Sequence, residues 1–211
     1  MNETDRPRST RDAVRRAAAL VFLERGYTDT SIQEIADRLG IPKGSAYHHV
    51  QSKEQFLYEV LTGGMEDLLG RLEAIVEYPL SAADRLRLAM WDSVKASFDD
   101  TQPATGMALH SDIRFLSDEH RLAYLALRDR YQALLVDLVE EGIQDGEFRP
   151  IENPKMIVFA ILGMLANVRR WFKLEGPLSL QTVTGFWWDL IFNGLHPQHA
   201  CEDFDVVARP S

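Results

Sequence analysis

Apolar residues recur three and four positions apart along nearly the whole chain, and no segment shows the period-two alternation of a half-buried strand. Glycine and proline divide this pattern into three short segments and about six longer ones. The sequence therefore predicts an all-α protein of about nine helices, at about residues 10–25, 30–40, 43–49, 52–77, 81–98, 106–115, 118–142, 154–173 and 179–195.

Helix start and stop signals fix several of these boundaries. Thr30 stands three residues before Gln33, and Ser52 stands three residues before Gln55, which is the spacing of a capping box. Gly26 follows the last periodic residue of the first segment and is expected to adopt a left-handed C-cap conformation. Ser117 is a good N-cap for the helix at 118–142. These signals predict a short second helix and a much longer fourth one. The apolar face of the first helix is expected to consist of Val14, Ala17, Ala18, Val21 and Phe22.

The charge of the chain is unevenly distributed. The 211 residues carry a formal net charge of −9, but residues 1–53 hold nine Lys and Arg against seven Asp and Glu. The acidic residues 54–211 would repel DNA, whereas the small basic segment 1–53 would be attracted to it. The alternative is a solvated, arginine-rich helix start, which the charge count alone does not reject.

Several classes of protein are excluded by simple features. A lone cysteine, Cys201, allows no internal disulfide framework, and no apolar run is long enough to span a membrane. The polar first ten residues contain no secretory signal. We therefore expect a cytoplasmic protein with no membrane partner.

Residues 30–53 contain the segment that indicates a function. Ile32, Ile35, Ala36 and Leu39 form one apolar face of a two-turn helix, and Gly40 then permits a sharp turn. A second short helix follows at once, and two short helices joined by a Gly-containing turn are a helix-turn-helix. This second helix presents small, hydroxyl and cationic side chains, as a helix that reads the major groove must, at Lys43, Gly44, Ser45, Tyr47 and His48.

The ordered motif resembles the N-terminal domain of TetR-family transcriptional regulators. The resemblance covers about a quarter of the chain and departs from the family pattern only at Ala46 and Val50, which keep their apolar character. The matching residues include Gly26-Tyr27-Thr28-x-Thr30-Ser31-Ile32, Leu39-Gly40-Ile41, Gly44-Ser45-Ala46-Tyr47-His48-His49-Val50, Lys53-Glu54 and Leu57.

This resemblance implies a role for each matching residue. The resemblance implies that the residues at the start of the recognition helix contact the DNA bases, and these are Lys43, Gly44 and Ser45. For Tyr47 and the histidines, packing on the helix-turn-helix core is the alternative interpretation. Contacts to phosphate, which set register and salt dependence, are expected from Thr30, Ser31, Tyr47, His48, His49 and Lys53.

The last two predicted helices contain a candidate dimer interface. Residues 156–166 are eleven apolar residues in a row, and a helix that is apolar all round is buried on all sides. An ordinary monomer core is the alternative, whereas the family resemblance implies a four-helix interface with two helices from each subunit of a homodimer. The candidate interface residues are Ala160, Gly163, Asn167, Phe186, Trp187, Leu190 and Ile191.

The middle helices are expected to hold a small-molecule effector, because TetR-like regulators are released from DNA by such ligands. The C-terminal part further resembles the branch that senses acyl-CoA thioesters, through residues 116–121, 128–131, 141–149 and 170–179. Most of the candidate pocket residues would be core in any helical protein. They are Trp91, Met107, His110, Arg114, Phe115, Tyr124, Arg128 and Trp171.

The predicted organisation is a DNA-binding domain at 1–53, a ligand-binding and dimerisation domain at 54–195, and a tail at 196–211. No HExxH, Walker or Rossmann motif and no strained nucleophile elbow is present, so we expect neither an enzyme nor a cofactor. His196, His199 and Cys201 have zinc-ligand chemistry but lack a fourth ligand, so no metal site is predicted. The alternative function is a helical homodimer that binds small molecules but not DNA.

Overall fold

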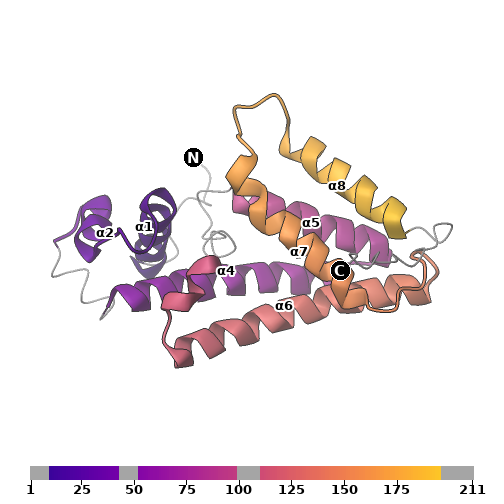
Figure 1. The fold of residues 1–211 in the computed structure, drawn as a ribbon, viewed down its shortest axis with the longest axis horizontal. Helices are drawn as coiled ribbons and strands as arrows, with labels where there is room; N and C mark the ends of the chain where they lie inside the picture. Colours follow the sequence, from indigo (N-terminus) through magenta and orange to yellow (C-terminus); the bar gives the residue numbers. More distant parts are fainter. Residues whose placement is uncertain (1–9, 43–51, 99–109, 196–211) are drawn as a thin grey trace, which may run out of the picture.

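The computed structural model of this chain describes residues 10–42, 52–98 and 110–195 (Figure 1). Within these ranges it contains no strand, so the predicted all-α class is confirmed. Its elements are α1 (Thr10–Arg25), α2 (Ile32–Leu39), α4 (Lys53–Val76), α5 (Ala82–Ser97), the 3-10 helix η2 (His110–Phe115), α6 (Asp118–Gln144), α7 (Pro154–Trp171) and α8 (Leu180–Leu195).

The expected number of about nine helices was too high for the described residues, which hold seven α-helices and one 3-10 helix. The third predicted segment, residues 43–49, lies outside the described residues. The segment predicted at 106–115 is described only from His110, and there it forms a tight 3-10 turn rather than an α-helix.

The start of α2 differs from the prediction by one residue. Ser31, not Thr30, is the N-cap: its Oγ accepts from the Glu34 backbone N–H at 3.3 Å, and the Glu34 carboxylate accepts from the Ser31 N–H at 2.7 Å. Thr30 lies one residue before the cap position, and its hydroxyl donates to the Gly26 carbonyl at 2.8 Å. The capping box therefore pairs Ser31 with Glu34 instead of Thr30 with Gln33.

The other predicted caps are confirmed. Gly26 ends α1 with φ +82° and Gly40 ends α2 with φ +67°, the left-handed region that an L side chain rarely adopts. Ser52 caps α4, because its Oγ accepts from the Gln55 N–H at 3.1 Å. Ser117 caps α6 in the same way, accepting from the His120 N–H at 3.3 Å.

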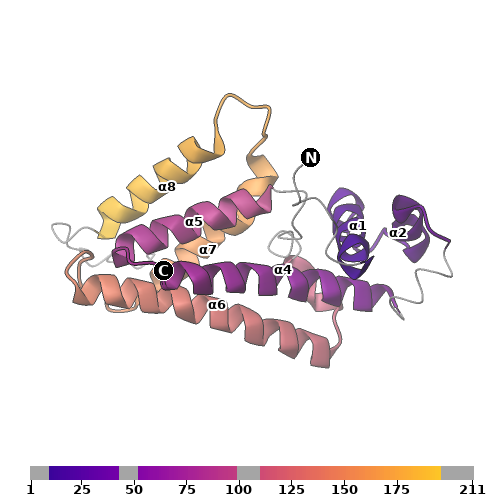
Figure 2. The same cartoon turned by 180° about the vertical axis from the view of Figure 1, so that it is seen from behind.

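Two groups of helices share the long helix α4 (Figures 1 and 2). Helices α1 and α2 form a small lobe over its N-terminal end, and α6 lies beside it along most of its length. Helices α5, α7 and α8 gather towards its other end. Helix α4 thus links the small lobe to the rest of the described molecule.

One continuous apolar core runs through both groups. The predicted inward face of α1 is confirmed, since Val14, Ala17, Ala18, Val21 and Phe22 are all buried. A smaller cluster of Val168, Phe172 and Val183 joins the end of α7 to α8. In the described residues, no helix combines the length and the hydropathy required to cross a membrane.

Candidate DNA-binding interface and effector cavity

Helix α2 is held firmly on α1. Ile35 and Ala36 are completely buried between them. Two ion pairs close the edges of this contact: Arg25 to Glu34 at 2.6 Å, and Arg38 to Glu24. The recognition segment that would follow α2, with Lys43, Gly44, Ser45, Tyr47, His48 and His49, lies outside the described residues.

The start of α2 was predicted to meet a phosphate through Thr30 and Ser31. Ser31 is exposed, but its N–H and hydroxyl both interact with Glu34, so a phosphate there must use the remaining N–H groups of the first turn. The Thr30 side chain is 3% exposed and its hydroxyl is engaged with Gly26. The phosphate contact of Thr30 stays a prediction. In the present structure the hydroxyl hydrogen of Thr30 is already donated to Gly26.

Hydrogen bonds also determine the charge at the start of α2. The backbone N–H and hydroxyl of Ser31 hold the pKa of the Glu34 carboxyl below its usual range, with a smaller contribution from the nearby Arg25 charge. Glu34 is therefore anionic at neutral pH, at a helix N-terminus whose dipole favours a negative group.

Arg15, one of the arginines of the basic N-terminal unit, is partly buried against α4. Its guanidinium lies against Gly63 of α4, where a Cβ atom would stand 1.7 Å from Nη1. Its Nη2 lies 3.6 Å from a carboxylate oxygen of Asp67. Gly63 thus permits a charged contact between α1 and α4, and this arginine belongs to the joint between the lobes.

Lys53 was predicted to contact phosphate from the start of α4. Its Nζ donates to three backbone carbonyls of the α1–α2 connection, at 2.9 Å to Tyr27, 3.1 Å to Thr28 and 2.8 Å to Thr30. It also lies 4.5 Å from the centroid of the Tyr27 ring. The predicted phosphate contact stays untested, but the ammonium group already has three acceptors within the chain.

The first turn of α4 also contacts the start of α6. The Glu54 Oε1 atom accepts from the Ser117 N–H at 3.0 Å and lies 2.8 Å from His120 Nδ1, and the His120 ring stacks on Tyr58 at 3.9 Å. Sequence reasoning assigned no role to Glu54 or His120. No local signal was available, because the two residues are 66 positions apart.

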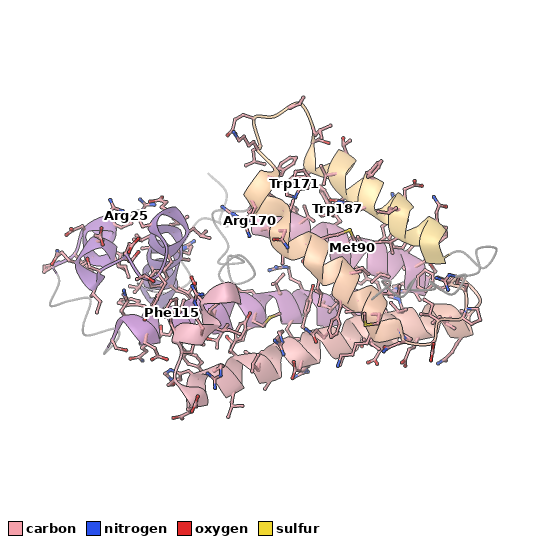
Figure 3. All side chains as sticks on the ribbon, in the orientation of Figure 1. Arg25, Met90, Phe115, Arg170, Trp171 and Trp187 are labelled. Atoms are coloured by element: carbon pink, nitrogen blue, oxygen red, sulfur yellow. The ribbon has the colours of Figure 1, made fainter. Side chains whose placement is uncertain are left out.

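Phe115 was predicted to line the effector pocket, but it lies at this joint (Figure 3). Its ring stacks on Tyr27 at a centroid distance of 4.8 Å, and the Arg114 guanidinium lies 4.8 Å from the centre of the Phe115 ring. Burial raises the pKa of the Tyr27 hydroxyl, and the nearby charges of Glu54 and Asp112 raise it further. Tyr27 is therefore neutral at physiological pH and joins the small lobe to the segment before α6.

Two of the predicted pocket residues, Tyr124 and Arg128, do line one cavity. It has a volume of about 240 Å³ and lies between α4, α6 and α7. Burial raises the pKa of Tyr124 to about 12, so its hydroxyl stays protonated. The remaining lining residues are mostly apolar, namely Met65, Tyr131, Gln132, Leu162, Gly163 and Ala166.

Trp91 and Trp171, which were also predicted to line the pocket, are not brought together with these two residues. Trp91 lines a different cavity, of about 600 Å³, between α5 and α8. Trp171 is half exposed at the end of α7, with its ring centroid 6.0 Å from that of Trp187 (Figure 3). His110 begins η2, and Met107 lies outside the described residues.

Most of the candidate interface residues of α7 and α8 are exposed in the single chain. Ala160, Gly163 and Asn167 are exposed along α7, and the Asn167 amide donates to the Gly163 carbonyl at 2.8 Å. On α8, Phe186 is 71% exposed and Leu190 is 61% exposed. Trp187 and Ile191 are partly buried against the core. We call Met156, Phe159, Ala160, Gly163, Asn167, Phe186 and Leu190 the open face.

Comparison with known proteins identifies the family. Residues 14–60 match the family described as bacterial regulatory proteins, tetR family, and residues 79–195 match the tetracyclin repressor-like C-terminal domain. The repressor KstR2 of Mycolicibacterium smegmatis is 32% identical over 190 residues, 90% of this chain and 92% of that protein. This chain belongs to the TetR family.

Solved structures of TetR-family proteins have the same fold. The TetR-family regulator PfmR of Thermus thermophilus has a TM-score of 0.77 and 32% identity, over 87% of this chain and 98% of that one. AibR, solved with isovaleryl coenzyme A and operator DNA, has a TM-score of 0.78 and 26% identity over the same shares. The chain is thus a transcriptional regulator of the TetR type and not an enzyme.

No group of His, Cys, Asp and Glu able to hold a metal ion occurs in the described part of the chain. The candidate ligands His196, His199 and Cys201 lie outside it.

Proposed function

We propose that this chain is a ligand-responsive repressor that binds a palindromic operator as a homodimer and leaves it when an acyl-CoA-type effector binds. The observation that carries the proposal is the presence, in one chain, of a closed α1–α2 unit and an open face on α7 and α8. In this proposal the α1–α2 unit belongs to the part that binds DNA. The open face is the surface through which two chains would pair. The proposal places the protein in the cytoplasm, together with its operator.

The open face supports a homodimer through its composition. Met156, Phe159, Phe186 and Leu190 are large apolar side chains that are 44–71% exposed in the single chain. Several large exposed apolar side chains on two helices are typical of an interaction site. Gly163 offers no side chain, and a Cβ built there meets nothing within 4 Å, so a partner helix has room to approach closely.

The α1–α2 unit supports DNA binding through its preorganisation. Its capping box, glycine C-caps and buried Ile35 position the chain that leads into the recognition segment. Within that segment, Lys43, Gly44 and Ser45 would read bases, and Tyr47, His48 and His49 would contact phosphates. One unit makes few base contacts, so two units on symmetric half-sites are required for specificity.

The effector class rests on the cavity and on the relatives. KstR2 is named a transcriptional repressor, and AibR was solved with isovaleryl coenzyme A. The cavity of about 240 Å³ is smaller than pockets that enclose a whole drug-sized ligand. We therefore infer that only an acyl or small ring group enters it, with the coenzyme outside. Arg128, now paired with Asp129 at 2.8 Å, is the cation among the lining residues and is able to bind a phosphate oxygen.

Selection of random duplex DNA by the purified chain at moderate salt tests this function. A palindromic sequence is expected among the retained molecules. Tyr47→Ala should weaken binding to every sequence, whereas Lys43→Ala should also change the preferred sequence. If a folded dimer retains no sequence, the DNA-independent small-molecule binder replaces the proposal.

The recovered operator then allows the effector class to be tested. Isovaleryl-CoA and longer acyl-CoA esters are added to the complex, with free CoA as the control. Release by an ester but not by free CoA is the expected result. Ala166→Trp, which fills the cavity, should keep operator binding and abolish release. If free CoA releases the complex as well as the esters do, the acyl group is not what the cavity recognises.

A further inference from the structure

We infer that the groove between α5 and α8 is a second ligand site, which takes a zwitterionic aromatic molecule of the size of an aromatic amino acid. The two helices lie side by side, and the groove between them has a volume of about 600 Å³, which is ample for a small ligand (Figures 1 and 2). It shares no lining residue with the cavity of about 240 Å³. The inference therefore goes beyond the proposed function and does not depend on DNA binding.

The groove lies away from the open face. Its wall on α8 includes Thr184 and Trp188, which are four positions apart and so share one side of the helix. Trp188 stands two positions from both Phe186 and Leu190 of the open face, and side chains two positions apart on a helix do not face each other. A dimer formed through the open face would therefore leave the groove accessible.

Two tryptophans supply flat apolar walls. Trp91 comes from α5 and Trp188 from α8, and both side chains are partly buried. In the part of the chain that the structure describes, no ring contact joins them, whereas Trp188 stacks on Phe192 at a centroid distance of 5.4 Å. Gly185 also lines the groove, and a Cβ built there meets nothing within 4 Å. A flat ring therefore has room to enter and stack on an indole.

Two charges of opposite sign lie at the same groove, one turn apart on α5. Asp84 stands in the first turn of α5, Arg87 follows three positions later, and both are exposed. Among the described residues, neither side chain makes a hydrogen bond or an ion pair, with the other or with a third group. The same spacing does form an ion pair on α6, between Asp118 and Arg121 at 2.6 Å. Asp84 and Arg87 are thus both available to a ligand.

The charges and the rings together select the class of ligand. The planar guanidinium of Arg87 binds a carboxylate through two parallel hydrogen bonds, and the carboxylate of Asp84 binds an ammonium group. A simple anion would be attracted by Arg87 but repelled by Asp84, and for a simple cation the reverse holds. An aromatic amino acid carries both charged groups on its α-carbon, one methylene from a ring that stacks on an indole. It therefore satisfies both charges and both rings of the groove.

Calorimetric titration of the DNA-free protein with L-tryptophan tests the site. Two matched ligands each lack one charge: indole-3-propionate lacks the ammonium group, and tryptamine lacks the carboxylate. Arg87→Gln and Asp84→Asn remove the corresponding charges of the groove, and Ala166→Trp, in the other cavity, is the control variant. Circular dichroism confirms that each variant is folded.

L-Tryptophan is expected to bind the parent protein about tenfold more tightly than either analogue, and each charge variant should lose about tenfold in affinity for it. In Arg87→Gln the advantage of L-tryptophan over tryptamine should disappear, because the partner of the carboxylate is gone. A general loss of structure would not produce this selective change. Ala166→Trp should bind like the parent protein.

The indole N–H signals of the four tryptophans locate the bound ligand by NMR. Those of Trp91 and Trp188 should shift, while those of Trp171 and Trp187 stay in place. Absence of binding at millimolar L-tryptophan, equal affinity for the three ligands, loss of binding in Ala166→Trp, or shifts confined to Trp171 and Trp187 would each overturn the inference. Because no DNA is present, these results are independent of whether the chain binds an operator.

Discussion

The first two helices and the last two helices bury their apolar residues in different ways. Helices α1 and α2 cover one another within the chain: Phe22, Ile35 and Ala36 are buried, and two ion pairs close the edges. Helices α7 and α8 bury only part of their apolar surface, leaving Phe159, Phe186 and Leu190 exposed. The first pair buries these residues within one chain, whereas the second pair leaves apolar side chains that a second chain would cover in the proposed homodimer.

This difference separates the determinants of local folding from those of assembly. A change inside the α1–α2 unit should act on stability and leave assembly alone. A change on the open face should act on assembly and leave the folding of one chain alone. The following variants test that separation.

A charge on the open face should produce the largest effect. Phe186→Glu places a carboxylate on the open face, where a partner chain would bury it without an opposite charge. We expect the dissociation constant of the dimer to rise about a thousandfold, which is about 4 kcal/mol. Sedimentation equilibrium measures this constant. Leu122→Glu, at an equally exposed leucine on α6, should leave the dimer intact. A dimeric Phe186→Glu protein would show that the open face is not the interface.

Removal of a buried side chain from the closed unit should destabilise it without affecting assembly. Ile35 is completely buried, so Ile35→Ala should lower the free energy of unfolding by about 3 kcal/mol. Urea denaturation followed by circular dichroism measures this loss. Leu39→Ala, at a half-buried position of the same helix, should cost less. Loss of the dimer at native stability would contradict the separation of the two regions.

Two glycines, one on the open face and one away from it, allow a comparison of two equally small substitutions. A Cβ meets nothing within 4 Å at Gly163 on the open face or at Gly185 on the other side of α8. Alanine at either site should favour the helix by up to about 1 kcal/mol in unfolding experiments. Only Gly163→Ala should weaken the dimer, by about fivefold or 1 kcal/mol, because a partner helix approaches that site. Equal effects of both substitutions on sedimentation would contradict a close approach at Gly163.

The smallest effect is expected at the cap of α2. Ser31→Ala should cost about 1 kcal/mol of stability, and it removes the hydroxyl that lowers the pKa of Glu34. Because that pKa is lowered by folding, its stabilising contribution is present above the ordinary range of a Glu carboxyl and is lost as the pH falls through the folded value. In the variant the pKa of Glu34 should rise, so less stability is lost on acidification.

An NMR titration of the Glu34 carboxyl in both proteins checks this expectation. Ser52→Ala is the control, because Ser52 caps α4 and does not contact Glu34. An unchanged pKa of Glu34 in Ser31→Ala would show that the hydroxyl does not stabilise the carboxylate.

Local interactions could be predicted from the sequence with good accuracy. The inward face of α1, the glycine C-caps at Gly26 and Gly40 and the caps at Ser52 and Ser117 all depend on residues within about four positions of one another. The one-residue error at Thr30 arose because Ser31 is an equally good cap. In the structure Ser31 takes the cap position, and the Thr30 hydroxyl bonds to the Gly26 carbonyl instead.

The candidate sites were predicted less completely, because apolar patterns do not say what covers them. The eleven apolar residues 156–166 were expected to be buried on all sides, yet Met156, Phe159 and Gly163 are exposed in the single chain. For the same reason, the residues predicted to line one pocket lie in different parts of the structure. Tyr124 and Arg128 share a cavity, whereas Phe115 lies at the joint between the lobes.

The sequence by itself determined that the chain is helical, where most of its helices begin and end, and that its first quarter resembles a helix-turn-helix domain. These features follow from capping, glycine conformation and apolar periodicity, which act over a few residues. Only the tertiary structure decided that Lys53 and Glu54 join the α1–α2 connection to the start of α6. Their partners lie 23–66 positions away, and no local pattern specifies which distant groups folding brings together.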